Sequence, residues 1–218
     1  MGNFCETCHT EPTYYNTIQE TSVINTTTIH IKSGNILEES EAIVFYVTPF
    51  LDALNEGQNR LMQYFLPYLS KRLIYMKKTE VLSYGSSVAF RIEDEEEAFQ
   101  WVILTVLPLD IAEMCNWFNG LRDVIERKEI GYVSMPFQSI PGFSKEQLAH
   151  SFISILTSSI IPETHSFLST INIYCNEGVL LKTLSKELGE HSEGNSVLAK
   201  KRVNSYEKEI IGIPVTHD

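Results

Sequence analysis

Residues 42–47 read Ala-Ile-Val-Phe-Tyr-Val, and residues 101–107 read Trp-Val-Ile-Leu-Thr-Val-Leu. Both runs are almost entirely apolar and do not alternate with polar residues, which is typical of strands buried on both faces. A sheet that is buried on both faces needs helices above and below it. These two runs therefore predict an α/β domain whose sheet is largely parallel.

Further strands and helices alternate along the rest of the chain. Clusters of β-branched and aromatic residues predict strands at 27–32, 88–92, 131–135 and 171–175. Apolar residues recurring three and four positions apart predict helices at 50–66, 110–125, 144–156 and 177–188. This alternation predicts a three-layer α/β/α sandwich with a mixed, largely parallel central sheet.

Several residues are expected to begin, end or line these helices. Asp110 and Ser144 are suited to cap the second and third helices, and Ser144 opens a Ser-Lys-Glu-Gln capping box. Pro67 is expected to kink or end the first helix, and Gly189 to stop the last one. Cys115 lies on the apolar face of the second helix, so we expect it to pack in the core and not to act as a nucleophile.

The composition indicates one globular domain with short tails. The chain has 218 residues, 43% of them hydrophobic and 21% charged, which is enough for a sizeable core. Residues 13–25 are polar and are interpreted as a linker, so the expected division is a tail at 1–25, a domain at 26–191 and a second tail at 192–218. The second tail carries a small basic cluster at residues 200–202.

Charge and cysteine usage exclude several classes of protein. A net charge of −11 repels phosphate backbones, so non-specific binding of nucleic acid is not expected. Four cysteines are too few for a disulfide scaffold. No apolar run reaches the ~18 residues of a membrane span, and no secretory leader opens the sequence. We therefore expect a soluble, cytoplasmic domain.

The first nine residues, Met-Gly-Asn-Phe-Cys-Glu-Thr-Cys-His, allow several interpretations. Myristoylation of Gly2 with palmitoylation of Cys5 and Cys8 would tether the protein to a membrane, although Glu6 stands where the usual signal has Ser or Thr. The Cys-x-x-Cys-His spacing also fits c-type haem attachment, but the chain shows neither an export signal nor a mostly helical pattern. The same residues could also supply half of the ligands of a zinc site. The last alternative is a plain tail with two free thiols.

The order of four segments resembles a macrodomain. Residues 31–36 (Ile-Lys-Ser-Gly-Asn-Ile) with 41–44 (Glu-Ala-Ile-Val) resemble the family's Gly-Asp-Ile turn and the strand after it. Residues 101–108 resemble its middle strand, 131–142 a later strand with the phosphate loop that follows it, and 171–188 its closing strand and helix. The resemblance covers residues 27–190 and implies a crevice for ADP-ribose at the carboxyl ends of the strands.

The same resemblance assigns candidate ligand-binding residues. Asn35, between Gly34 and Ile36, stands where the family has an aspartate that accepts from the adenine amino group. Ser139 and Gly142 belong to the second phosphate loop, and Phe143 matches an aromatic residue that stacks on the ligand. Alternatively, Gly34 and Asn35 make only a turn, and Phe143 packs over the following helix.

Two departures from the family pattern affect the expected function. Where active macrodomains have Asn-Ala-Ala-Asn, residues 45–48 read Phe-Tyr-Val-Thr, and the glycine-rich loop is reduced to Asn-Glu-Gly-Gln at 55–58. A single glycine cannot provide the repeated close backbone approach that a diphosphate needs. We therefore expect a non-catalytic interaction or scaffold module whose crevice is eroded and filled by Phe45, Tyr46 and Phe143. A reader of ADP-ribose or a related nucleotide is the alternative, and a hydrolase is the third possibility.

No other residue set predicts catalysis, a cofactor or a metal. Histidines 30, 150 and 165 are expected to be ordinary surface or core residues, and the acidic run at 93–97 a solvated turn. The protein partner that a scaffold requires is not specified by any motif.

Overall fold

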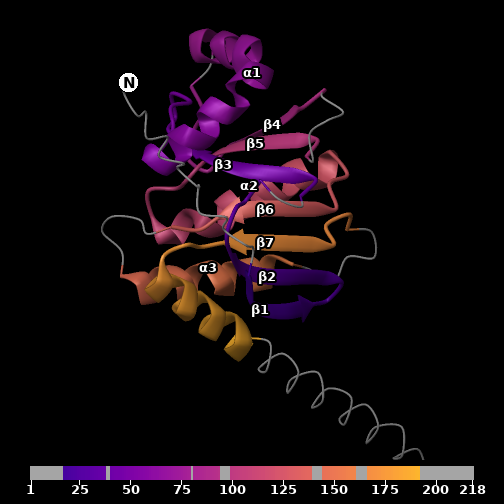
Figure 1. The fold of residues 1–218 in the computed structure, drawn as a ribbon, viewed down its shortest axis with the longest axis vertical. Coiled ribbons are helices and arrows are strands. Elements are labelled where there is room, and N and C mark those ends of the chain that lie inside the picture. Colours follow the sequence, from indigo (N-terminus) through magenta and orange to yellow (C-terminus); the bar gives the residue numbers. More distant parts are fainter. Residues whose placement is uncertain are drawn as a thin grey trace, which may run out of the picture.

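The computed structural model describes residues 17–37, 40–79, 81–93, 99–138, 144–160 and 166–191, and every structural statement below concerns these residues. Within them, seven strands form one sheet in the order β1-β2-β7-β6-β3-β5-β4. The strands are β1 (Thr17–Ile24), β2 (Thr27–Ser33), β3 (Ala42–Val47), β4 (Ser87–Arg91), β5 (Trp101–Val106), β6 (Tyr132–Pro136) and β7 (Thr170–Tyr174). Figure 1 shows them stacked from β4 at the top to β1 at the bottom.

The sheet is mixed and largely parallel, as the sequence predicts. The five inner strands β2, β7, β6, β3 and β5 pair in parallel. The two edge strands, β1 and β4, are antiparallel to their neighbours. All five inner strands therefore end at the same edge of the sheet.

Helices cover both faces of this sheet. They are α1 (Glu56–Thr79), the short 3-10 turn η1 (Ile111–Glu113) that leads into α2 (Met114–Arg127), α3 (Lys145–Ser159), and a last helix at residues 178–191. One apolar cluster holds α1 against the sheet, and a second holds α2, α3 and the last helix against the opposite face. The predicted α/β/α sandwich is confirmed. None of the helices within the described ranges is long and apolar enough to cross a membrane.

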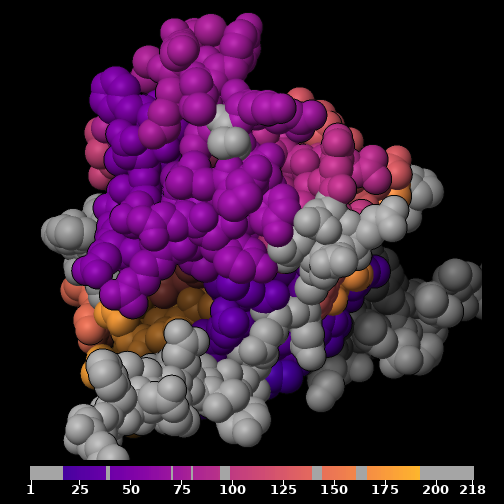
Figure 2. Space-filling view, turned by 45° about the horizontal axis from the view of Figure 1, so that its top comes forward, coloured from indigo at the N-terminus to yellow at the C-terminus, as the bar shows by residue number. Residues whose placement is uncertain are grey.

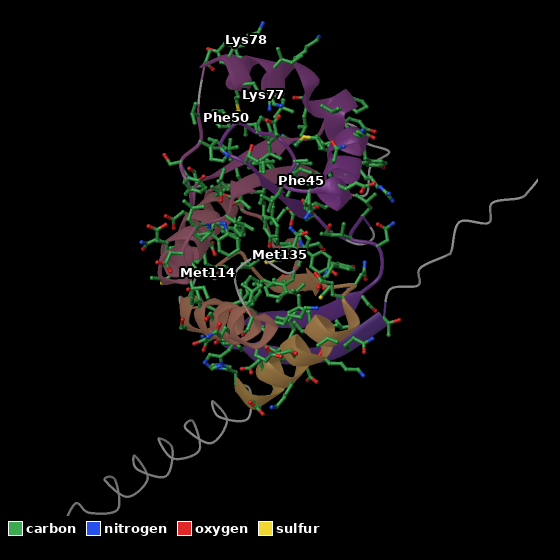
Figure 3. The ribbon with its side chains drawn as sticks, turned by 90° about the vertical axis from the view of Figure 1, so that its left-hand side faces the viewer. Phe45, Phe50, Lys77, Lys78, Met114 and Met135 are labelled. Carbon is green, nitrogen blue, oxygen red and sulfur yellow. The ribbon has the colours of Figure 1, made fainter. Side chains whose placement is uncertain are left out.

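Strand β3 shows how one sequence supplies both cores. Its six residues are all buried, and they alternate between the two clusters: Ala42, Val44 and Tyr46 face α2 and α3, whereas Ile43, Phe45 and Val47 face α1. Figure 3 shows Phe45 on the α1 side, and Met114 with Met135 in the other layer. The continuous apolar run is thus the direct consequence of burial on both faces.

The linker predicted at residues 13–25 is wrong from Thr17 onwards. Residues 17–24 form β1, which pairs with β2 through a hairpin turn at Asn25, whose φ is +55°. Most of β1 is exposed, so its sequence is polar although it belongs to the sheet. The domain therefore begins about nine residues earlier than residue 26, whereas residues 1–16 and 192–218, including the basic cluster, lie outside the described residues.

The first helix also differs from the prediction. Leu51 has a φ of +62° and belongs to a loop, so α1 starts at Glu56 and not near residue 50. It continues past Pro67, which is exposed, to Thr79, so Pro67 does not end the helix. The caps at Asp110 and Ser144 are confirmed, since their side chains accept from the backbone N–H of Ala112 and Gln147.

Two further expectations are corrected. Cys115 is exposed, because the buried face of α2 runs through Met114, Trp117, Phe118 and Leu121 instead. The last helix does not stop at Gly189 but extends to residue 191. The acidic run at 93–97 falls largely outside the described residues.

Candidate ligand-binding crevice

The carboxyl ends of the five parallel strands are the place where an α/β sheet binds ligands. The segments that follow β2, β3, β5, β6 and β7 meet at this edge. They supply the turn at Gly34, the loop at 48–55, the segment at 107–110, the residues after Pro136 and the residues after Tyr174. The conformation of each segment determines whether this edge of the sheet is accessible to a ligand.

The turn after β2 carries the predicted residues Gly34, Asn35 and Ile36. Gly34 has a φ of +131°, a conformation that favours glycine. Its N–H donates to Oδ1 of Asn176 at 2.9 Å, and Nδ2 of Asn176 donates to the Gly34 carbonyl at 3.0 Å, so this turn is tied to the end of β7.

Asn35 lies at the expected strand end and is exposed, but its Oδ1 accepts from the N–H of Leu37 at 3.1 Å. It thus closes its own turn, the alternative that the sequence left open. Ile36 packs in the α1-side core and is 7% exposed, so its side chain does not face a ligand.

The loop after β3 folds back on itself where a phosphate-binding loop would leave its backbone open. The Thr48 N–H donates to the Asp52 carbonyl, and the Leu51 N–H donates to the Thr48 carbonyl. Leu51 is fully buried and packs under α1. The buried leucine and the internal hydrogen bonds fix the conformation of this loop.

Asn55 joins the two sides of the crevice. Its Oδ1 accepts from the Gln58 N–H at 2.9 Å and so caps α1, while its Nδ2 donates to Oε1 of Gln138 at 2.8 Å. Gln138 lies just after β6, at the start of the second loop. One side chain therefore occupies the helix N-terminus, a natural anion site, and also bridges to the opposite loop.

Tyr46 fills the space beneath this bridge. Its N–H donates to Oε1 of the buried Gln58 at 3.1 Å, and its hydroxyl donates to the Pro136 carbonyl at 2.6 Å. Burial raises the pKa of Tyr46 far above its usual value of 10.0, so the phenol stays protonated and donates at any physiological pH.

One hollow that described residues line at this edge is small and apolar. Its volume is ≈ 10 Å³, and its lining comes from Tyr46, Leu107, Met114, Trp117, Phe137, Gln138, Leu148 and Phe152. Sites for drug-sized ligands have volumes of about 300–1,000 Å³. This hollow has room for about one water molecule, and a nucleotide would not fit in it.

The structure tests the other predicted site residues unevenly. Ser139, Gly142 and Phe143, as well as Gly2, Cys5 and Cys8, lie outside the described residues. Phe45 does not enter the crevice, because its ring packs edge-on against Phe65 of α1 with centroids 6.2 Å apart. Tyr46 lines the hollow at this edge, and its hydroxyl donates to the Pro136 carbonyl.

Asn55, Gln58 and Gln138 make hydrogen bonds at this edge that the sequence interpretation missed. Asn55 precedes a helix by one residue, the position at which asparagine is favoured as an N-cap, and that signal could have placed it. No signal links Asn55 to Gln138, 83 residues away.

Reactive groups near this edge are also few among the described residues. Cys175 follows β7, and burial raises the pKa of its thiol to about 11, so it is a poor nucleophile at neutral pH. His30 lies within β2 and bonds Thr21, far from the strand ends.

No family model matches the sequence, and no curated protein matches it either. Solved structures match it clearly in three dimensions. A macrodomain from Oceanobacillus iheyensis, solved with MES bound, superposes with a TM-score of 0.70 at 16% identity, covering 83% of this chain and 100% of that one. The same macrodomain with ADP gives a TM-score of 0.69 at 16% identity, covering 83% and 99%.

A more distant match has the same architecture. The Trypanosoma brucei macrodomain in complex with ADP-ribose superposes with a TM-score of 0.60 at 12% identity, covering 72% of this chain and 68% of that one. Element order, sheet topology and these superpositions agree, so this chain has the macrodomain fold. The resemblance found in the sequence is confirmed for the fold.

Proposed function

We propose that this chain is a non-catalytic interaction module with a macrodomain fold, whose ancestral ligand crevice is closed by its own side chains. The observation that carries the proposal is the ≈ 10 Å³ hollow left at the carboxyl edge of the sheet. Macrodomains from two organisms are solved with ADP or ADP-ribose, and such ligands require far more space. A fold can be retained while its ligand site is lost, and the proposal is that this has happened here.

The absence of turnover is supported by what replaces the family's asparagines. At the corresponding positions Phe45 packs into the α1-side core and Tyr46 donates to a backbone carbonyl. Neither side chain can orient a ribose and a water molecule, which hydrolysis needs. An interaction module needs no such group.

Calorimetric titration of the full chain with ADP-ribose tests this proposal. The expected result is no saturable heat at millimolar ligand, with the T. brucei macrodomain titrated alongside as a positive control. Saturable binding would overturn the closed crevice, and release of ADP-ribose from a modified protein would overturn the non-catalytic role.

A reader of ADP-ribose is the second candidate, and the exposed Asn35 at the end of β2 favours it. Binding would require the Asn55–Gln138 bridge to open. If heat is observed, Asn35→Ala should weaken it because an adenine acceptor is lost, whereas Asn59→Ala, an exposed asparagine within α1, should not.

Tethering to a membrane is a separate part of the proposal, supported by Gly2, Cys5 and Cys8 in the sequence. One acyl chain binds membranes marginally and two bind stably. In cell fractionation, Gly2→Ala and the pair Cys5→Ser with Cys8→Ser should each move the protein from the membrane fraction to the cytosol. Equal partitioning of parent and variants would show that no tether exists.

A further inference from the structure

Two histidines and a glutamate converge where α3 meets the last helix. His150 lies on α3, while Glu187 and His191 lie four residues apart on the helix at 178–191, and so on one face of it. Nδ1 of His150 lies 2.8 Å from Oε2 of Glu187, and the two imidazole rings have centroids 6.1 Å apart. One ligand atom from each residue lies within 4.8 Å of the others.

Charge and burial favour a cation at this cluster. The Glu187 side chain is 16% exposed, whereas the His150 side chain is 64% exposed, so the carboxylate is held in place and one side of the cluster is open to solvent. The neighbouring lysines pair elsewhere: Lys186 with Glu190, and Lys145 with Glu177. Within the described part of the chain, no lysine forms an ion pair with Glu187.

We propose that His150, Glu187 and His191 bind a Zn²⁺ ion. Two imidazoles and one carboxylate are ligands that zinc prefers, and a bound water would complete a tetrahedron. Zinc–ligand bonds of about 2.0–2.2 Å place ligand atoms roughly 3.4 Å apart, which small side-chain rotations reach from the present positions. The ion would join α3 to the last helix, and it stands apart from the crevice and from the proposed function.

The test is a zinc titration that separates this cluster from other ligands in the chain. Cys5, Cys8 and His9 could also bind zinc, so the full chain carries Cys5→Ser, Cys8→Ser and His9→Asn as a common background. Zinc affinity and the thermal midpoint are measured for this background and for His150→Asn and His191→Asn on it. Glu190→Gln, which removes a carboxylate one position from His191, is the matched control.

The expected result is one zinc per chain with micromolar affinity and a thermal midpoint that rises with zinc. Each histidine variant should lose at least about tenfold in affinity, because one of three ligands is gone. The control should bind like the background. No binding by the background, or equal binding by the histidine variants, would overturn the site and leave an ion pair.

A second observation concerns the outer side of α1. Five residues spaced four and three apart lie on one exposed side of this helix, and together we call them the tyrosine–lysine face: Tyr64, Tyr68, Lys71, Tyr75 and Lys78. The other side of α1 is buried against the sheet. Figure 2 shows α1 as the projecting purple end of the molecule, and Figure 3 places Lys78 at its tip.

The charge of this helix opposes that of the whole protein. Helix α1 carries five of the 17 basic residues of the chain and, at Glu56 in its first turn, one of the 28 acidic residues. Near the tip, Tyr75 is 65% exposed and its neighbour Ile74 is 55% exposed. Exposed tyrosines beside lysines are typical of residues at a membrane–water interface.

We infer that the tyrosine–lysine face docks on an anionic lipid surface. The inference rests on the proposed tether and is compatible with its length. A fully extended chain of 16 residues spans about 53 Å, whereas a sheet of seven strands is about 29 Å wide, so residues 1–16 are long enough to reach across the sheet. A lipid-modified N-terminus could therefore stay in the same membrane on which α1 lies. Each lysine near the surface attracts anionic lipid at short range.

Vesicle sedimentation tests this face. The full chain is used without lipid modification, so that the tether does not contribute to binding. The protein should bind vesicles containing phosphatidylserine, fail to bind pure phosphatidylcholine, and be released by salt. Lys71→Glu with Lys78→Glu should reduce the bound fraction at least about threefold. Lys182→Glu with Lys186→Glu, exposed lysines on the last helix, should leave it unchanged.

Equal binding by both double variants, or no binding to anionic vesicles, would overturn the inference. Binding of single-stranded RNA through the same lysines without vesicle binding would identify a different polyanion and overturn it as well. The protein in this test is not acylated. A failure to bind vesicles would therefore overturn the docking face but would not bear on the lipid tether, which the Gly2→Ala fractionation tests separately.

Discussion

We expect His30 to make the stability of the fold depend on pH. It is partly buried in β2 beside Thr21, and burial together with nearby Lys32 lowers its pKa below 6.5. In the unfolded chain the ring binds a proton near pH 6.5, so this contribution to stability is present above that pH and is lost as the pH falls below it. His30→Asn should therefore lose less stability than the parent between about pH 7.5 and about pH 5.5, measured by urea unfolding. Parallel pH profiles would contradict this assignment.

The two cysteines in the described residues should differ sharply in reactivity. Cys115 is exposed on α2, whereas Cys175 is buried with its pKa raised to about 11. Because the thiolate is the nucleophile, iodoacetamide at neutral pH should modify Cys115 and leave Cys175 intact in the folded protein. Peptide mass spectrometry reads both sites, and unfolding in urea should make Cys175 react. Modification of Cys175 at a rate equal to that of Cys115 would show that its segment opens.

At the scale of elements, Asn55 should be important for the start of α1. Asn55→Ala removes the cap on the Gln58 N–H and the bond to Gln138, so we expect a loss of about 1 kcal/mol in the free energy of unfolding. Asn59→Ala makes the same change one turn into the helix and should cost nothing, because alanine is the better helix former. Chemical denaturation compares the two. A loss in Asn59→Ala as large as that in Asn55→Ala would mean that the cap is not the cause.

Elements buried on both sides could be predicted from the sequence, and elements at the edges could not. Strand β3 is entirely apolar because helices cover both its faces. Strand β1 was missed because only Ser22 and Ile24 are buried in it, although its β-branched residues and the turn at Asn25 carried a weaker signal. For α1, Leu51 and Leu54 extended the helical spacing backwards, whereas the backbone at Leu51 is not helical.

The contacts across the candidate crevice depend on the fold of the whole molecule. The loss of the family's asparagines could be seen in residues 45–48, and so an eroded site was predicted. The two hydrogen bonds across this edge could not be predicted, because Asn55 reaches Gln138 and Tyr46 reaches Pro136 across 83 and 90 positions of sequence. Such contacts exist only after β3 and β6 have become neighbours in the sheet.

Strand β1 is part of the stable domain because it covers one edge of the sheet. Its hydrogen bonds cover the outer edge of β2, and Ile24 packs in the core beneath α2 and α3. A chain that starts at residue 26 exposes that edge and loses the hairpin, so its thermal midpoint should fall by several degrees, or more, relative to a chain that starts at residue 17. It should also aggregate more readily, because an unpaired strand edge can pair with another chain. Scanning calorimetry and light scattering measure both effects. Equal midpoints would mean that the domain begins at residue 26 and that β1 is only an appendage to it.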